Sequence, residues 1–272
     1  MKLVDSHIHF WDINNGFNNW VENTVLPRLV TPELVHADAF VHIEAHSETV
    51  DPLCEYNWLA STFPNKNIKV VAFVDFTLDF AEFAKKIEHL SEHDNIVGVR
   101  QIMSKTYKSE YSPFDKEIPK DLEQKLKILK EYKLIFEAQM YPEQFLPLLE
   151  KINKSEVSMA VEHFGLPIFG RNNNLDQWHK FIKEFAQKPN WTLKLSGFDL
   201  NNNILDVGKA LDFIFENITF HKLCYGSNFP VSYQNDYNYW QSFLQQYINN
   251  DNISKNIFEN VARRIYFKNQ EV

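Results

Sequence analysis

The chain has 272 residues, of which 44% are hydrophobic and 24% are charged, and its formal net charge is −8 at pH 7. This composition is that of an ordinary globular protein, with enough apolar residues to bury a sizeable core. The moderate negative charge, with no basic cluster or arginine-rich arm, argues against nucleic acid as a partner.

Cysteine usage and hydropathy point to the inside of the cell. The two cysteines, Cys54 and Cys224, lie far apart and form no Cys-x-x-Cys pair, which disfavours a disulfide framework or a zinc finger. No signal-peptide pattern precedes the first apolar run, and no stretch of about 18 apolar residues predicts a membrane span. We therefore expect a cytoplasmic protein with no membrane partner, and the sequence leaves its oligomeric state open.

Apolar runs typical of buried strands alternate along the chain with segments whose apolar residues recur at helical spacing. The predicted strands cover residues 2–4, 39–45, 69–75, 96–100, 134–139, 157–164, 191–196 and 222–225. Helical patterns follow most of them, at about residues 51–63, 80–90, 122–129, 145–152, 178–185, 207–218, 237–248 and 253–267. About 25 residues with little pattern, 12–36, form a long loop after the first strand.

Eight strands that alternate with helices predict parallel strands in an α/β fold, a (β/α)₈ TIM barrel of the metal-dependent-hydrolase type. We expect one domain, residues 1–272. An open doubly wound sheet is the alternative, but it would usually carry a glycine-rich turn after the first strand. Here that turn is Asp5-Ser6-His7, and the whole chain has only seven glycines.

Polar residues gather where the predicted strands end, and in a TIM barrel the carboxyl ends of the strands form the active site. His7 and His9 point to the same side of an extended chain, roughly 6 to 7 Å apart, and could bind one divalent ion together. The residues at these strand ends are His7, His9, Glu44, His46, Asp75, Arg100, Gln139, Tyr141, His163, Ser196 and Asn228.

In its motifs the chain resembles the amidohydrolase superfamily, in the branch that includes 2-pyrone-4,6-dicarboxylate lactonase and the sugar-acid lactonases. The stretch Asp5-Ser6-His7-Ile8-His9-Phe10-Trp11 is similar to the opening D-x-H-x-H-x-W of that branch. Its closing F-G-S-D-W-P is similar to Tyr225-Gly226-Ser227-Asn228-Phe229-Pro230. Internal landmarks are similar at residues 98–100, 136–139, 162–165 and 194–197, and the C-terminal helix is similar at 260–266.

The resemblance implies roles for individual residues. His7, His9 and His163 fall on positions that bind a metal or polarise the substrate, and the metal would be zinc or manganese. Some members of the branch work without metal, so a metal-free site stays open. Arg100 falls where lactonases contact a substrate carboxylate, and Tyr141 lies near a hydroxyl contact. Gln139, Glu44 and His46 complete the candidate substrate-binding set.

One position departs from the family pattern. The last strand of the family ends in an aspartate that takes a proton from the attacking water, and this chain has Asn228, whose amide cannot accept that proton. The chain could be a catalytically degraded member, a variant made to trap a ligand, or a protein in which another carboxylate has taken over. Phe229 in place of tryptophan favours natural drift, and Glu44 is the candidate replacement base or metal ligand.

Other interpretations stay open beside these roles. Arg100 could instead neutralise Glu137 or Asp75 inside the barrel. Lys194 and Ser196 share a face and could form a catalytic pair, although a lysine that is ion-paired within the barrel is the stronger interpretation.

We thus expect a hydrolase that opens an ester or lactone bond of a small carboxylated or sugar-derived molecule. The enzymatic alternative is a metal-dependent decarboxylase of the same superfamily. The non-enzymatic alternative is a degraded barrel that binds a small acid without turnover.

Overall fold

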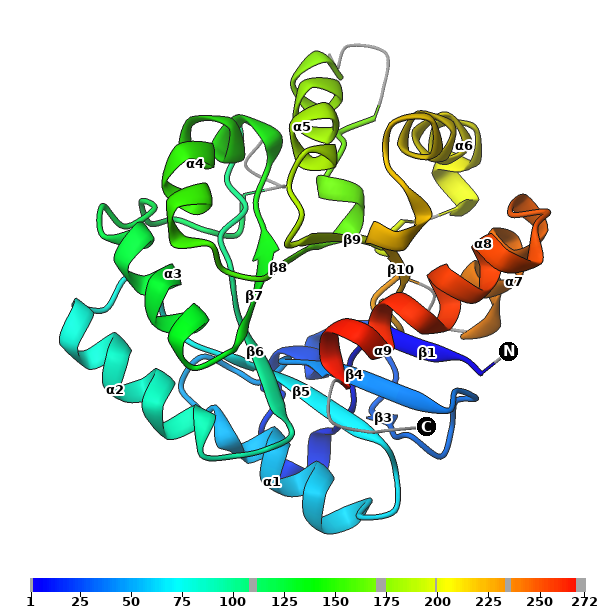
Figure 1. The fold of residues 1–272 in the computed structure, drawn as a ribbon. Helices are drawn as coiled ribbons and strands as arrows, with labels where there is room; N and C mark the ends of the chain where they lie inside the picture. Colours follow the sequence, from blue (N-terminus) through cyan, green and yellow to red (C-terminus); the bar gives the residue numbers. More distant parts are fainter. Residues whose placement is uncertain (1, 108–111, 170–174, 199, 233–235, 268–272) are drawn as a thin grey trace.

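The structure, a computed structural model, describes residues 2–107, 112–169, 175–198, 200–232 and 236–267. Its centre is a parallel sheet in the order β1-β4-β5-β6-β7-β8-β9-β10, and a bridge between Ile8 and Phe229 brings its two edges together. The strands are β1 Val4–Ile8, β4 Ala39–Ile43, β5 Ile68–Phe73, β6 Ile96–Ile102, β7 Ile135–Gln139, β8 Met159–Val161, β9 Trp191–Leu195 and β10 Leu223–Tyr225. This nearly closed α/β barrel confirms the predicted fold (Figure 1).

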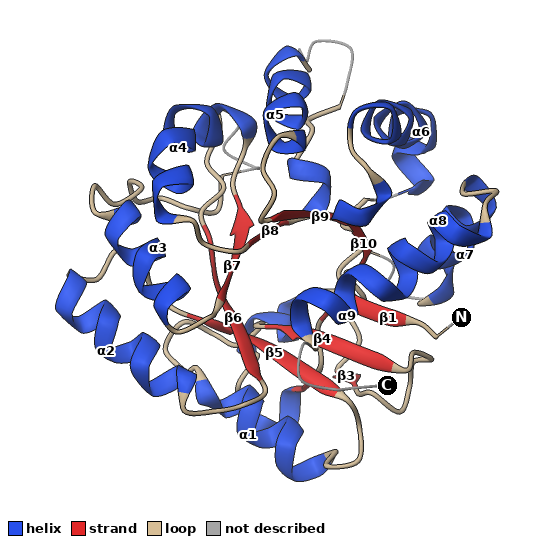
Figure 2. Cartoon of the chain, in the orientation of Figure 1, coloured by secondary structure: helices blue, strands red, loops and turns tan. Residues whose placement is uncertain are grey.

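Helices surround the barrel as an outer ring (Figure 2). Each presents an apolar stripe to the strands, as Phe83, Ile87 and Leu90 do in α2, because residues three and four apart share one helix face. The helices of the ring are α1 Leu53–Thr62, α2 Phe80–Ser91, α3 Leu122–Glu131, α4 Pro142–Ser155, α5 Asp176–Ala186, α6 Leu200–Asn217 and α7 Asn238–Tyr247.

The C-terminal helical segment covers the amino end of the barrel. It consists of α8 Asp251–Lys255, the π-helical turn η6 Asn256–Asn260 and α9 Val261–Tyr266, and α9 crosses the barrel opening in Figure 1. The hydroxyl of Tyr266 donates to Oε1 of Glu137 inside the barrel, and Nζ of Lys194 lies 2.8 Å from Oε2 of the same glutamate. Lys194 is therefore ion-paired within the barrel, which is the interpretation that the sequence favoured over a catalytic pair with Ser196.

Three segments differ from the predicted elements. The first strand, predicted at residues 2–4, is Val4–Ile8, because Asp5-Ser6-His7, predicted as the turn after it, is buried and continues the strand beside β4. The strand predicted at residues 157–164 ends at Val161, because the backbone turns into the left-handed region from His163 to Leu166, where a short turn, η4 His163–Gly165, replaces the strand. The long loop after β1 contains two strands that pair antiparallel, β2 Trp11–Asp12 and β3 Leu29–Val30, and two 3₁₀ turns, η1 Ile13–Asn15 and η2 Asn19–Asn23.

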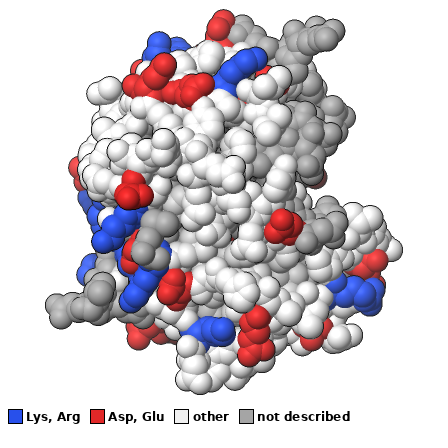
Figure 3. Space-filling model, turned by 90° about the vertical axis from the view of Figure 1, so that its right-hand side faces the viewer, with Lys and Arg blue, Asp and Glu red and all other residues white. Residues whose placement is uncertain are grey.

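The surface shows no large patch of one charge on the described part of the face in Figure 3, where acidic and basic side chains lie interspersed. Among the described residues, no helix is both long enough and apolar enough to span a bilayer.

Candidate active site

A pocket of about 380 Å³ lies at the carboxyl end of the barrel. Most of the candidate residues chosen from the sequence line it, namely His9, Glu44, His46, Arg100, Gln139, His163 and Asn228. His7 is fully buried and is not part of the lining. Tyr141 lines a different cavity of about 210 Å³, which shares only His163 with the main pocket. The structure therefore brings seven of the predicted candidates into one pocket, leaves His7 buried outside its lining and places Tyr141 in a different cavity.

Three imidazoles converge at this end of the barrel. The ring centroid of His7 lies 5.2 Å from that of His9 and 4.7 Å from that of His163. Backbone and side-chain oxygens hold the two outer rings, since Nδ1 of His9 is 2.9 Å from the carbonyl oxygen of Ile43 and Nδ1 of His163 is 2.9 Å from Oγ of Ser196. Strand β1 thus supplies one imidazole at its end and a second just beyond it, and the turn after β8 supplies the third.

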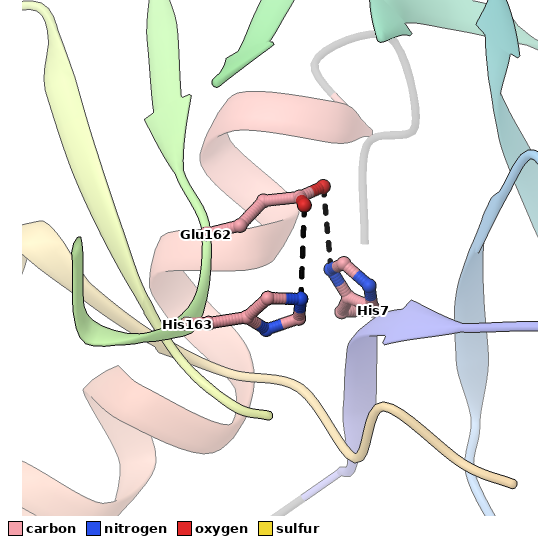
Figure 4. Close-up of side chains that lie close together, drawn as sticks. All are labelled: His7, Glu162 and His163. Carbon is pink, nitrogen blue, oxygen red and sulfur yellow. Dashed lines mark ion pairs between the residues drawn. The ribbon is translucent and has the colours of Figure 1, made fainter. Parts of the chain in front are cut away.

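Glu162 joins two of the imidazoles, and its role was missed in the sequence. Its Oε1 lies 3.6 Å from Nδ1 of His7, and its Oε2 lies 3.7 Å from Nε2 of His163. Figure 4 shows the carboxylate facing both rings, with one oxygen directed at each. The ligand atoms of these three residues all lie within 4.8 Å of one another. Strand alternation would put Glu162 and His163 on opposite faces, and the left-handed turn after β8 cancels that alternation.

Two pocket residues, His163 and Asn228, adopt the left-handed backbone conformation, each with a φ of 51°. A left-handed conformation costs a residue with a side chain roughly 1–2 kcal/mol, so the surroundings must hold it.

Two glycines make room for the imidazoles. A Cβ on Gly197 would lie 2.3 Å from Nδ1 of His163, and a Cβ on Gly226 would lie 2.6 Å from Cβ of His7.

The guanidinium of Arg100 donates hydrogen bonds to two glutamates of the protein. Its Nε donates to Oε1 of Glu44 at 2.8 Å, its Nη2 donates to the Glu44 carbonyl oxygen at 2.9 Å, and its Nη1 donates to Oε2 of Glu162 at 3.2 Å. The partners considered from the sequence were wrong, because Glu137 pairs with Lys194 and Asp75 pairs with Lys116 at 3.2 Å. Arg100 therefore ties Glu44, on the pocket wall, to Glu162 beneath it.

Burial keeps the three imidazoles neutral. Loss of solvent lowers the pKa of His7 and of His9 well below the usual value, with nearby Lys194 adding to the effect at His7 and Arg100 at His9. Burial also lowers the pKa of His163 to about 4. For Glu44, burial raises the pKa even though Arg100 opposes the shift. Neutral imidazoles are the form that binds a metal.

The residues present fit a divalent metal ion. Neither ring nitrogen of His7 has a hydrogen-bond partner among the described residues, although the ring is fully buried. Such an imidazole is costly unless something binds it. Two imidazole nitrogens and one carboxylate are a donor set that suits zinc, so His7, Glu162 and His163 could hold the ion. His9 is not part of this set and reaches Asn228 instead.

Asn228 sits where a basic group was expected. Its backbone N–H donates to the carbonyl oxygen of His7 at 2.7 Å, and its side-chain Nδ2 donates to Oγ of Ser232 at 2.7 Å. Its Oδ1 lies 3.2 Å from Nε2 of His9. The amide thus bridges two neighbours but has no group that could take a proton from water at neutral pH.

The chain is similar over most of its length to a known protein family and to a bacterial protein. The profile of one family, described as amidohydrolase, matches residues 4–268. An uncharacterized protein, y4mH, of Sinorhizobium fredii is 25% identical over 265 residues, covering 85% of this chain and 86% of that protein.

Two solved structures share the fold. An amidohydrolase from Burkholderia multivorans with bound zinc has a TM-score of 0.79 at 17% identity, covering 98% of this chain and 99% of that one. A probable 2-pyrone-4,6-dicarboxylic acid hydrolase from Acinetobacter baumannii with bound citric acid has a TM-score of 0.68 at 18% identity, covering 98% and 100%.

Proposed function

The chain belongs to the amidohydrolase family, and from this premise we propose that it is a hydrolase that opens an ester or lactone bond. The proposed substrate is a small molecule that carries a carboxylate or derives from a sugar acid. The observation that carries the proposal is the cluster of His7, Glu162 and His163, whose ligand atoms lie within 4.8 Å of one another. His163 of this cluster also lines a pocket of a size suited to a small ligand.

A divalent metal, for which zinc is our choice, would be held by His7, Glu162 and His163. When bound, it supplies a Lewis acid that polarises the carbonyl of the substrate. Support comes from the ring nitrogens of His7, which have no hydrogen-bond partner among the described residues, and from the zinc in the Burkholderia multivorans amidohydrolase of the same fold.

The pocket walls supply the contacts that orient the substrate. Gln139 at the end of β7 and His46 just after β4 offer polar groups, and Trp20, Phe73 and Phe114 offer aromatic faces. Arg100 lends positive charge to one wall, but most of its N–H groups are bound to Glu44 and Glu162, so its first role is to hold these two carboxylates in place. Tyr141 lines the smaller cavity beyond His163 and would act on a part of the substrate that extends there.

We assign the water-activating role to Glu44. Its carboxylate lines the pocket, and burial raises its pKa toward the range in which a carboxylate is an effective base. In the proposed step, a carboxylate oxygen of Glu44 takes a proton from a water molecule as the water oxygen bonds to the carbonyl carbon. The proton then passes to the leaving oxygen as the ester bond breaks, which yields an acid and an alcohol, or one hydroxy acid from a lactone.

The experiment is hydrolysis of a lactone panel by the purified chain, with acid release followed by a pH indicator. The panel contains sugar-acid γ- and δ-lactones and 2-pyrone-4,6-dicarboxylate. Turnover by the parent, lost in His7→Asn and retained in Glu48→Gln at the pocket rim, would support the proposal. Binding of these compounds without turnover would favour the degraded binder, and release of carbon dioxide from an aromatic acid would favour the decarboxylase.

A further inference from the structure

The segment that carries His163 is a complete left-handed turn. His163, Phe164, Gly165 and Leu166 have φ values of 51°, 59°, 73° and 55°, so four successive residues adopt a conformation that L-residues avoid. Only one of the four is glycine. Such a turn persists only where its surroundings over-determine it, and it lies directly after the strand that delivers Glu162.

Side chains from the outer helical ring lie against this turn, namely Trp178 and Phe181 of α5 and Trp240 of α7, and Trp178 donates a hydrogen bond to its backbone. The indole Nε1 of Trp178, in α5, donates to the carbonyl oxygen of Phe164 at 2.7 Å, and both residues are buried. The indole also stands close to the backbone of the turn, since a Cβ on Gly165 would lie 3.8 Å from Nε1. Within the turn, the N–H groups of Gly165 and Leu166 donate to the carbonyl oxygens of Glu162 and His163, both at 2.9 Å.

From these contacts we propose that Trp178 is a positioning residue, which locks the left-handed turn through Phe164 and so holds His163 beside Glu162 and His7. The proposal rests on the function proposed above, in which those three residues hold the metal. Trp178 touches neither substrate nor metal ligand through this bond. It fixes the peptide group that follows Phe164, one residue beyond His163, and so restrains the backbone that holds the imidazole 3.7 Å from the Glu162 carboxylate.

The loss of this bond can be tested by two replacements. Trp178→Phe removes the N–H together with part of the ring. If that variant folds poorly, 3-benzothienylalanine at position 178 keeps the bicyclic shape and replaces only the N–H by sulfur. The matched control is Trp240→Phe, because Trp240 is also fully buried, also contacts the Phe164 ring and donates its indole N–H to a backbone carbonyl, that of Leu195 in β9, at 2.9 Å.

The first readout is amide hydrogen exchange, which depends neither on metal nor on activity. We expect the amides of Gly165 and Leu166 to exchange at least tenfold faster in the Trp178 variants than in the parent and in Trp240→Phe, while amides in β4 and β5 are unchanged. Unchanged exchange at Gly165 and Leu166, or equal acceleration in the control, overturns the proposal.

The second readout is zinc affinity, measured by titration of the metal-free chain. We expect a loss of about tenfold in the Trp178 variants, the range typical of residues that orient metal ligands. The double variant Trp178→Phe with Leu166→Gly should recover most of it, since glycine adopts positive φ without strain. If the parent binds no zinc while exchange responds as expected, the proposed function fails and the locking role of Trp178 stands. Zinc affinity equal to that of the parent in both Trp178 variants overturns the link to His163.

Discussion

Nε2 of His9 lies 3.2 Å from Oδ1 of Asn228, while Nδ1 of the same ring faces the carbonyl oxygen of Ile43. Both oxygens can only accept, and a neutral ring carries one N–H hydrogen, so His9 donates to one of them at a time. The side chain that closes the barrel therefore offers His9 a second acceptor but no base.

Asn228→Asp should raise the rate of lactone hydrolysis by at least tenfold if a base at this position is limiting, because a positioned base contributes typically 10²–10⁴-fold. The new carboxylate would stand beside His9 and share a proton with it. Steady-state rates on the lactone panel provide the measurement. Asn228→Ala is the control, and equal rates in the aspartate and alanine variants would contradict the prediction.

Glu44→Gln should reduce turnover by the parent about 100-fold, since the amide cannot accept the proton from water. The change also removes one charged partner of Arg100, so the midpoint of thermal unfolding must be measured alongside kcat. Glu48→Gln alters another carboxylate of the same pocket and should leave kcat within about threefold of the parent. A Glu44→Gln enzyme with full activity would leave water activation to a different group.

Removal of metal with a chelator should abolish hydrolysis, and added zinc should restore it. Glu162→Gln should weaken zinc binding at least tenfold, because an amide oxygen is a poorer ligand than a carboxylate and because two imidazoles alone leave the ion under-coordinated. Metal content after dialysis, measured by elemental analysis, is the test. His9→Gln should lose less zinc than Glu162→Gln, since His9 lies outside the cluster. Equal zinc loss in both variants would refute this ligand assignment.

Gly197→Ala should displace His163, because the added Cβ would lie 2.3 Å from Nδ1 and the residue has a φ of 82°. We expect loss of activity by about 100-fold and destabilisation of about 1–3 kcal/mol, the usual cost of overpacking. Gly208→Ala is the matched control, since nothing lies within 4 Å of its Cβ position and it sits inside α6. That change should instead stabilise the protein by about 1 kcal/mol. Chemical denaturation and kcat of both variants check the pair.

The free energy of unfolding of the parent should fall as pH rises from 4 to 7, because the carboxyl of Asp5 loses its proton in this range. Burial raises the pKa of this carboxyl from 3.8 to about 6, against opposing hydrogen bonds from Ser227, His7 and Tyr237. The protonated form is favoured in the folded state, so its contribution is full below pH 3.8 and is lost as pH passes 6. This corresponds to about 3 kcal/mol. Asp5→Asn should therefore gain stability relative to the parent across this range.

The measurement for Asp5 is urea denaturation at pH 4, 5, 6 and 7. Ser155→Ala provides a control, because Ser155 is buried and its hydroxyl bonds to backbone groups, donating to the Ile152 carbonyl oxygen and accepting from the N–H of Val157. Its difference from the parent should not change with pH. A constant difference for Asp5→Asn would show that folding does not raise the pKa of Asp5 and would contradict the prediction.

The barrel could be predicted from the sequence because its signals are local. Strands and helices alternate with different apolar periods, and the stripe Phe83, Ile87 and Leu90 in α2 needs no distant partner to be recognised. The features that could not be predicted are contacts between residues far apart in the sequence. The contact of Tyr266 with Glu137 spans 129 positions, and nothing in the pattern near either residue indicates that α9 would cover the amino end of the barrel.

The site was predicted in part for a related reason. Strand ends bring side chains to one rim, so the convergence of His7, His9 and His163 followed from the topology. Glu162 was missed because the alternation rule assigns it the face opposite to its neighbour, and only the left-handed turn overrides that rule. The partners of Arg100 were wrong because Glu44 and Glu162 approach it from two different strand ends, at spacings that sequence does not encode.

Closure of the barrel has a consequence for the order of events during synthesis on the ribosome. Strand β1 meets β10 and the residues just after it through contacts that include the bridge of Ile8 to Phe229 and the hydrogen bond from Oγ of Ser6 to the carbonyl oxygen of Tyr225, and the covering helix α9 follows later in the chain. Until nearly the whole polypeptide has been synthesised, one edge of β1 therefore stays unpaired, and His7 and His9 lack their contacts with Asn228. An unpaired strand edge can pair with another chain, so this edge is open to aggregation during that interval.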